Sequence, residues 1–268
     1  MKTGLTLEQL AAEITRQQSA KEDYVVNTGN LRLESYGPDL TLRVLDSDGA
    51  DRIEPLEIGD IAHRQIGTHL SIPAKYYERM RSEDPGLLAH NVNTWLERTP
   101  AQRMIRVLDG KARAYLSNRY LRMDNYSIAS AVLPILAEIP DVRIESCQIT
   151  DSRMYIKAVN PRLQEDVTPG DTVQAGVVIS NSEVGLGSVN IQPLIYRLVC
   201  SNGMVVNDMG ERRHHVGRQA KAVEDSFALY SDETMEAEDK AFLLKLRDTT
   251  MAAIDEARLS QAVGRLQG

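Results

Sequence analysis

The chain has 268 residues and carries 31 Lys+Arg against 38 Asp+Glu, which gives a formal net charge of -7. This length suits one large domain or two small ones, and a hydrophobic share of 42% excludes a disordered chain. No apolar run reaches the about 18 residues of a membrane span, and the polar N-terminus lacks the apolar stretch of a signal peptide. With Cys147 and Cys200 as its two cysteines, the sequence predicts a reduced cytoplasmic protein without a disulfide framework or a cofactor.

The N-terminal part is expected to be a helix followed by short strands. Thr6 and Gln9 have the spacing of a capping box, and Leu7, Leu10 and Ile14 recur at helical spacing after it. Turn-forming residues then separate three strand candidates. These strands are expected at residues 24–26, 31–33 and 40–45.

The rest of the chain changes from helices to strands and back. Residues 60–97 have a helical pattern that is broken at Pro73 and at Asp84-Pro85-Gly86. Residues 103–208 favour strands, with one helix near 125–138, and a long helical pattern covers 232–263.

This order of elements predicts an α+β fold, in which helices back an antiparallel, hairpin-rich sheet and a long helix ends the chain. We expect three parts. They are an N-terminal helix with short strands at 1–58, an α+β core domain at 59–222, and an acidic segment with the terminal helix at 223–268.

The clearest local feature is a hairpin around Asp109-Gly110, a dipeptide typical of two-residue type I′ turns. A two-residue loop would place Arg106 directly opposite Arg113 and turn Tyr115 to the same face as both arginines. Two facing arginines are mutually unfavourable. The sequence therefore indicates that an anionic ligand relieves their repulsion.

Basic residues and tyrosines alternate around this hairpin, which favours a nucleic-acid backbone groove with base stacking. The alternative is an ordinary solvated hairpin face. The predicted DNA contacts of this first basic segment are Arg103, Arg106, Lys111, Arg113, Tyr115, Arg119, Tyr120 and Arg122.

A second group of basic residues lies further along the chain. A second hairpin around Asp151-Ser152 would put Arg153, Tyr155 and Lys157 on one face. The further predicted DNA contacts are Arg153, Lys157, Arg197, Arg212, Arg213, His214, His215 and Arg218. A metal site at Cys200, His214 and His215 is an alternative reading of part of this group.

Other features give weaker signals. The small, polar stretch from Ser180 to Ser188 contains two glycines and could cradle a phosphate with backbone N–H groups, or simply connect two strands. No metal-protease, nucleophile-elbow or Cys-x-x-Cys motif is present. The sequence therefore predicts a binding protein and not an enzyme.

Three stretches carry a resemblance to a known family. The segment GVVISNSEVGLGSVNIQPLIYRLVCSNGMV (176–205) resembles the signature of an uncharacterised phage- and plasmid-like family, known only as a domain of unknown function. RVLDGKARAYLSNRYLRMDN (106–125) and IPAKYYERM (72–80) agree with it, so that the resemblance covers roughly residues 60–220. It implies a mobile-element origin and a distant likeness to single-strand annealing recombinases, which bind DNA along a basic groove.

These observations together predict a single-stranded DNA-binding protein of phage or plasmid DNA metabolism. We expect it to act in annealing or recombination as a homo-oligomeric ring or filament, without a membrane. Its net charge does not oppose this, because seven acids lie between Glu224 and Asp239 and the remaining acids equal the bases in number. The alternative is a protein-binding accessory or counter-defence module of a mobile element. It is motivated by an apolar stripe on the terminal helix, which would serve assembly or simply pack on the core. The stripe consists of Leu243, Leu246, Thr250, Ile254 and Ala257.

Overall fold

The computed structural model describes residues 2–46, 48–198, 203–205, 211–213, 232–253, 259–260 and 263–265. These residues form two compact units. The first unit combines Met1–Thr15 with Leu121–Gly268, and the second is Arg16–Tyr120. Their boundaries differ from the divisions expected after residues 58 and 222.

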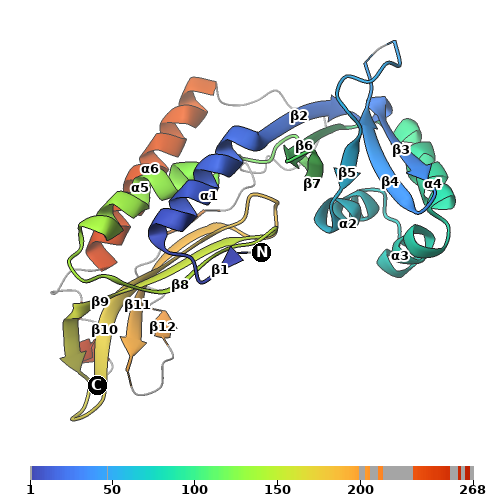
Figure 1. Cartoon of the computed structure of the whole chain (residues 1–268). Coiled ribbons are helices and arrows are strands. Elements are labelled where there is room, and N and C mark those ends of the chain that lie inside the picture. Colours follow the sequence, from blue (N-terminus) through green and yellow to red (C-terminus); the bar gives the residue numbers. More distant parts are fainter. Residues whose placement is uncertain are drawn as a thin grey trace. The chain divides into compact units, whose positions relative to one another are not determined.

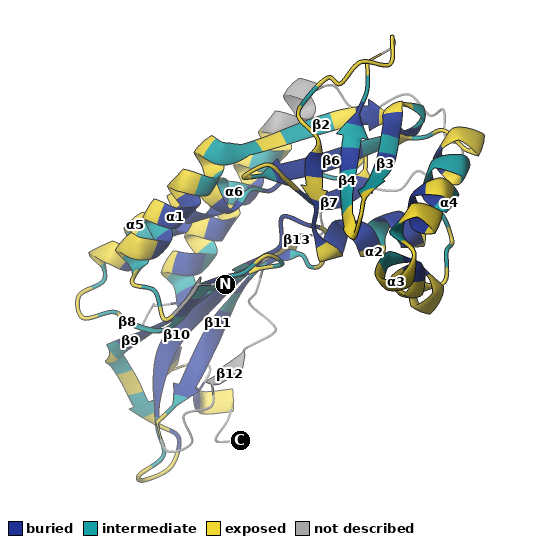
Figure 2. Cartoon of the chain, turned by 45° about the vertical axis from the view of Figure 1, so that its right-hand side comes forward, coloured by how far each residue is buried: buried dark blue, intermediate teal, exposed yellow. Residues whose placement is uncertain are grey.

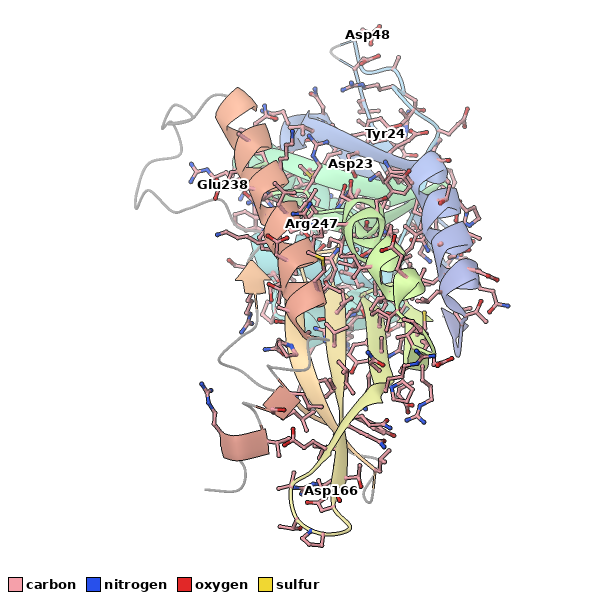
Figure 3. The ribbon with its side chains drawn as sticks, turned by 90° about the vertical axis from the view of Figure 1, so that its left-hand side faces the viewer. Asp23, Tyr24, Asp48, Asp166, Glu238 and Arg247 are labelled. Atoms are coloured by element: carbon pink, nitrogen blue, oxygen red, sulfur yellow. The ribbon has the colours of Figure 1, made fainter. Side chains whose placement is uncertain are left out.

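The first unit is built on a seven-stranded antiparallel sheet. Its strands have the order β1-β8-β9-β10-β11-β12, and β13 pairs with a different part of β11 than β12 does. The strands are β1 (Lys2–Thr3), β8 (Arg143–Ile149), β9 (Met154–Asp166), β10 (Thr172–Asn181), β11 (Val189–Arg197), β12 (Gly203–Val205) and β13 (Glu211–Arg213). Figure 3 shows Asp166 at the far end of β9, where the chain turns back toward β10.

Three helices cover one face of this sheet (Figure 1). They are α1 (Leu7–Ala20), whose first part belongs to this unit, α5 (Asn125–Glu138) and α6 (Asp232–Ala253). Apolar residues from the helices, including Leu10, Val132 and Leu246, pack with Ile156 and Val177 of the sheet in one buried core. Figure 2 shows that β10 and β11 are buried along most of their length.

The second unit has a six-stranded sheet with the order β2-β6-β7-β5-β4-β3. Among its described strands, β5 and β7 pair in parallel and the other neighbours pair antiparallel. The strands are β2 (Lys21–Asn27), β3 (Leu31–Tyr36), β4 (Asp39–Val44), β5 (Leu56–Ile58), β6 (Gln102–Leu108) and β7 (Lys111–Ser117), with a short 3-10 turn, η1 (Thr28–Asn30), after β2. The helices α2 (Asp60–His69), α3 (Ala74–Glu83) and α4 (Pro85–Arg98) pack on one face of this sheet around a core that includes Leu33, Leu88 and Ile105.

Local signals place the ends of these helices. The Thr6–Gln9 capping box forms: the Thr6 amide donates to Gln9 Oε1 at 3.0 Å and the Gln9 amide to Thr6 Oγ1 at 3.2 Å. Asp84 caps α4 by accepting from the Leu87 amide at 2.9 Å, with Pro85 in the first turn. The α+β prediction is confirmed, and α6 has a moderate length, with its end at Ala253.

The apolar stripe expected on the last helix is part of the core where it is described. Leu246 and Thr250 are 0% exposed, and Leu246 packs in the core of the first unit with Phe242. Ile254 and Ala257 lie outside the described residues. None of the helices in the described part of the chain is long and apolar enough to span a membrane.

Candidate nucleic-acid interface

The hairpin around Asp109-Gly110 forms, but its register differs from the expected one. Both turn residues have positive φ, 53° and 74°, as a type I′ turn requires. Leu108 pairs with Lys111, and an irregularity between Arg106 and Val107 then shifts the pairing by one residue. Arg106 therefore lies opposite Ala114 and not opposite Arg113, so the expected repulsion between facing arginines is wrong.

Arg106 belongs to the interior of the fold. It is 0% exposed, and its guanidinium donates two hydrogen bonds to Asp23 on β2, from Nε at 2.9 Å and from Nη2 at 3.0 Å (Figure 3 labels Asp23). Removing one partner of a buried pair like this costs about 3–5 kcal/mol. The prediction that Arg106 holds phosphate is wrong, and a charge reversal there would test folding and not DNA binding.

The register expected from the sequence also puts Tyr115 on the wrong face of the hairpin. The irregularity sets it opposite Ile105, so that it turns to the helix-covered face and is only 4% exposed. Its hydroxyl lies 2.8 Å from His69 Nδ1 at the end of α2. Burial raises the pKa of Tyr115, and burial followed by the charge of Arg103 lowers the pKa of His69 to about 4. Tyr115 is therefore not available to stack on a base, and that prediction is wrong.

The other residues of the first basic segment keep some contact with solvent. These residues are Arg103, Lys111, Arg113, Arg119, Tyr120 and Arg122. Lys111 pairs with Glu57 on β5, and the Arg103 guanidinium carbon lies 5.8 Å from the centroid of the Tyr115 ring. Arg122 belongs to the first unit and the other five to the second.

The loop from Ser180 to Ser188 closes on the start of α5. Asn181 donates to the Met123 carbonyl at 2.9 Å and to Asn125 Oδ1 at 2.8 Å, while the Glu183 carboxylate accepts from the Asn125 amide at 2.6 Å. Asn181 and Ser182 are 0% exposed. A carboxylate at a helix N-terminus satisfies a free amide and the helix dipole. The Asn-Ser-Glu-Val-Gly motif thus caps a helix, a role that the sequence reading missed.

The second predicted hairpin forms from β8 and β9, and it carries the candidate interface. On β9, Ile156 and Ala158 point into the core under the helices, whereas Tyr155, Lys157 and Val159 alternate with them and face the other way. We call this second side of the seven-stranded sheet the outer face. Val178, Leu194 and Tyr196 of β10 and β11 pack there with Val159.

A cluster of cations surrounds Tyr196 on the outer face. The Lys157 ammonium lies 4.6 Å and the Arg143 guanidinium carbon 5.7 Å from the centroid of the Tyr196 ring. Arg143 donates to Glu145, and burial together with a hydrogen bond to Glu145 raises the pKa of the Tyr196 phenol. Among the described residues, Lys157 forms no ion pair with a carboxylate. The cluster therefore combines a buried aromatic ring with a half-buried lysine that pairs with no carboxylate of the described residues.

Three further predicted residues belong to the same sheet or its turns, and their recorded partners lie outside this cluster. Arg153 is exposed at the turn before Tyr155, with Nη2 directed toward the Leu186 carbonyl at 3.5 Å. Arg197, one residue after Tyr196, pairs with Asp171 at 3.0 Å. Arg212 on β13 is exposed and donates to Ser188 at 3.0 Å.

Some predicted residues cannot be assigned to this face. Arg213 is described only as part of β13, and nothing is placed for its side chain. The predicted contacts His214, His215 and Arg218, and the possible metal ligand Cys200, lie outside the described residues. Within the described residues, no three His, Cys, Asp or Glu side chains gather as a metal site would need.

Comparison with known families places the outer face inside a recognised domain. The model of DUF932, a domain of unknown function, matches residues 114–258, which is more than half of the chain. The chain belongs to this family. No curated protein and no solved structure is significantly similar to it. The expectation that the chain belongs to an uncharacterised domain family is confirmed.

The DUF932 match contains the whole cluster around Tyr196, whereas α2, α3 and α4 precede it. The sequence reading found Arg153 and Lys157 in this domain but missed Arg143 and Tyr196. The missed residues sit on β8 and β11, and β11 is separated from β9 by β10. Only the alternation of side chains along each strand could have indicated that they share a face.

Proposed function

We propose that this DUF932 protein binds single-stranded DNA on the outer face of its seven-stranded sheet and promotes annealing or recombination as a homo-oligomer. The observation that carries the proposal is the placement of Lys157 and Arg143 around Tyr196. On this proposal the protein serves a phage, a plasmid or a related element in a bacterial cytoplasm. The cluster supports the ligand, and the annealing reaction is carried over from the expectation that the sequence resemblance raised.

The chemistry of the cluster suits a single strand. Lys157 and Arg153 supply cations for phosphates, and the half-buried ring of Tyr155 lies between them in sequence as a surface for base stacking. The ring of Tyr196 is 8% exposed, so it holds the cations in place and does not itself stack on a base. Neutralising phosphates releases counterions, so binding must weaken with salt.

Annealing requires a strand that is held by its backbone while its base edges remain open to a complementary strand. A sheet face with cations at its surface provides such contacts, since cations select phosphates without reading sequence. Arg143, Lys157 and Tyr196 all lie within the residues that match DUF932 and within the first unit, which supports a common role for them in this domain.

The proposal predicts the effect of Lys157→Gln on DNA binding. Affinity for a labelled oligothymidylate, measured by fluorescence anisotropy across a salt series, should fall. The slope of log affinity against log salt should become shallower by about 0.7, because one phosphate contact is lost from a single strand. Annealing of complementary strands, followed by energy transfer between labels, should slow in parallel.

The matched control is Arg79→Gln on α3 of the second unit. Arg79 is equally cationic and exposed, and it pairs with Glu83 one helical turn further on at 2.9 Å. It should retain the wild-type affinity and slope. Equal losses in both variants would remove the outer face as the site, and salt-independent or undetectable binding by the wild type would refute the proposed function. Particle size measured with and without DNA reports the oligomer.

A further inference from the structure

A pocket in the second unit remains outside the proposed interface. It has a volume of about 550 Å³, within the range of small-molecule sites. The end of α2, the loop after it, α3 and α4 provide its walls. The lining includes His69, Tyr76, Asn91 and Trp95. All of these residues precede the DUF932 match, so the pocket lies outside the matched domain.

Two aromatic rings of this pocket are open to solvent. Tyr76 on α3 is 48% exposed and Trp95 on α4 is 43% exposed, although large apolar surfaces are usually buried. The Arg98 guanidinium carbon lies 5.4 Å from the centroid of the Trp95 ring. Exposed aromatic rings beside an arginine are the surface on which a nucleobase stacks.

Neutral polar groups sit at the other side of the pocket. His69 contacts the Tyr115 hydroxyl through Nδ1 at 2.8 Å, and burial lowers its pKa to about 4, so the imidazole is neutral at physiological pH. The Asn91 amide nitrogen donates a hydrogen bond to the Leu87 carbonyl at 3.0 Å, which leaves the amide oxygen as an acceptor. Neutral donors and acceptors of this kind match the edge of a base better than a charged group would.

A cation for a phosphate lies near His69, although it does not line the pocket itself. Arg103 stands beside the Tyr115 ring and its charge acts on His69. Its Nε is buried and has no hydrogen-bond partner, and no carboxylate of the described residues pairs with it. A half-buried guanidinium without an anionic partner is costly, and a phosphate would supply that partner.

We infer that this pocket binds one nucleotide, with the base against Trp95 and Tyr76 and the phosphate on Arg103. The nucleotide comes either from a single strand, in which case the site deepens the proposed function, or from a free mononucleotide. An apolar peptide would use the same rings but would leave Arg103 without a partner. The charge next to the pocket therefore favours the nucleotide.

Trp95 makes a direct test possible, because it is the only tryptophan of the chain. Its fluorescence is followed while thymidine monophosphate, thymidine, oligothymidylate or an uncharged apolar peptide is added. We expect saturable quenching by thymidine monophosphate. Tyr76→Ala should weaken this binding at least about fivefold, as loss of a stacking ring does. Tyr126→Ala, which removes a similarly exposed ring on α5 (43%), should leave it unchanged.

Arg103 is tested by comparing a ligand with and without its phosphate. Arg103→Gln should lower the affinity for thymidine monophosphate to that for thymidine, while its affinity for thymidine itself stays at the wild-type value. An equal loss for both ligands would show a structural effect and overturn the assignment of the phosphate. The Tyr76→Ala comparison keeps the base site testable if Arg103→Gln does not fold.

The outcomes separate this inference from the proposed function. Labelled oligothymidylate could bind by anisotropy while neither it nor thymidine monophosphate quenches Trp95. That result overturns nucleotide binding in the pocket and leaves the proposed function of the outer face in place. Quenching by the mononucleotide without strand binding supports the pocket as a site for a free nucleotide, and refutes the proposed function. Quenching by both supports the strand as the source. Quenching by the apolar peptide alone overturns the inference.

Discussion

Two histidine–tyrosine pairs join α2 to its neighbours: His63 contacts Tyr77 on α3, and His69 contacts Tyr115 on β7. His63 is 2% exposed, and its Nδ1 lies 2.9 Å from the hydroxyl of Tyr77 on α3. Burial, with a smaller contribution from the nearby Arg81 charge, lowers the pKa of His63 to about 4. Both His63 and His69 are therefore neutral in the folded protein near neutral pH. Each would have to take up its proton in a poorly solvated place.

The stability of the protein should fall as the pH drops from 6.5 toward 4. The unfolded chain binds a proton at His63 near pH 6.5, whereas the folded chain binds it only near pH 4. Between pH 7 and pH 5 this linkage lowers the free energy of unfolding by about 2 kcal/mol, which urea unfolding at both pH values measures. His63→Gln should show a pH dependence smaller by that amount. An identical pH dependence in both proteins would contradict the neutral buried histidine.

At the scale of elements, close packing decides which helices fit together. Gly67 lies on α2 directly against α3, and a Cβ there would come within 2.9 Å of Tyr77 Cδ2. Tyr77 cannot move easily, because it is 2% exposed and held by His63. The contact explains why a helix interior keeps a glycine in spite of its low helix propensity.

Gly67→Ala should therefore destabilise the protein by about 1–3 kcal/mol, although alanine favours a helix. The matched control is Gly86→Ala on α4, where the nearest atom, Asp84 Oδ1, would be 3.5 Å from the new Cβ. The control should be neutral or more stable by up to about 1 kcal/mol. Thermal and urea unfolding of both variants give the comparison, and a Gly67→Ala protein as stable as wild type would be at odds with the packing.

At the scale of the whole molecule, the first unit contains residues from both ends of the chain, and the second unit is inserted between them. The N-terminal strand β1 pairs with β8, where Lys2 lies opposite Ile149. Leu10 and Ile14 of α1, 0% and 2% exposed, complete the core that α5, α6 and the sheet form. The core of the domain that matches DUF932 is therefore completed by N-terminal residues that lie far outside the match.

This arrangement predicts that Leu10→Ala weakens the core around Cys147, which is 1% exposed in the same cluster. The expected loss is about 2–5 kcal/mol, equivalent to labelling of the Cys147 thiol that is at least about 30-fold faster. Cys200→Ser in both proteins leaves Cys147 as the only thiol to be measured. Glu8→Ala, which alters an exposed residue of the same helix, should label at the wild-type rate; acceleration in both or in neither variant would argue against the shared core.

The sequence by itself determined the elements whose signals are local. The Thr6–Gln9 box, the breaks at Pro73 and at Asp84-Pro85-Gly86, and the turn at Asp109-Gly110 depend on residues within a few positions, and the structure confirms each. Side-chain alternation likewise put Lys157 on a face away from the core. Such signals are readable because the interacting groups lie close together along the chain.

Only the tertiary structure decided which basic residues are exposed and which are part of the fold. The irregularity in β6–β7 turned Tyr115 inward, and Arg106 found its partner Asp23 at a distance of 83 residues in sequence. Glu183 caps α5 from 58 residues away, and Tyr196 meets Lys157 across an intervening strand. A charge pattern in the sequence gives the sign of the net charge of a segment. Whether a cation faces solvent or a buried carboxylate depends on long-range pairing, which no local pattern contains.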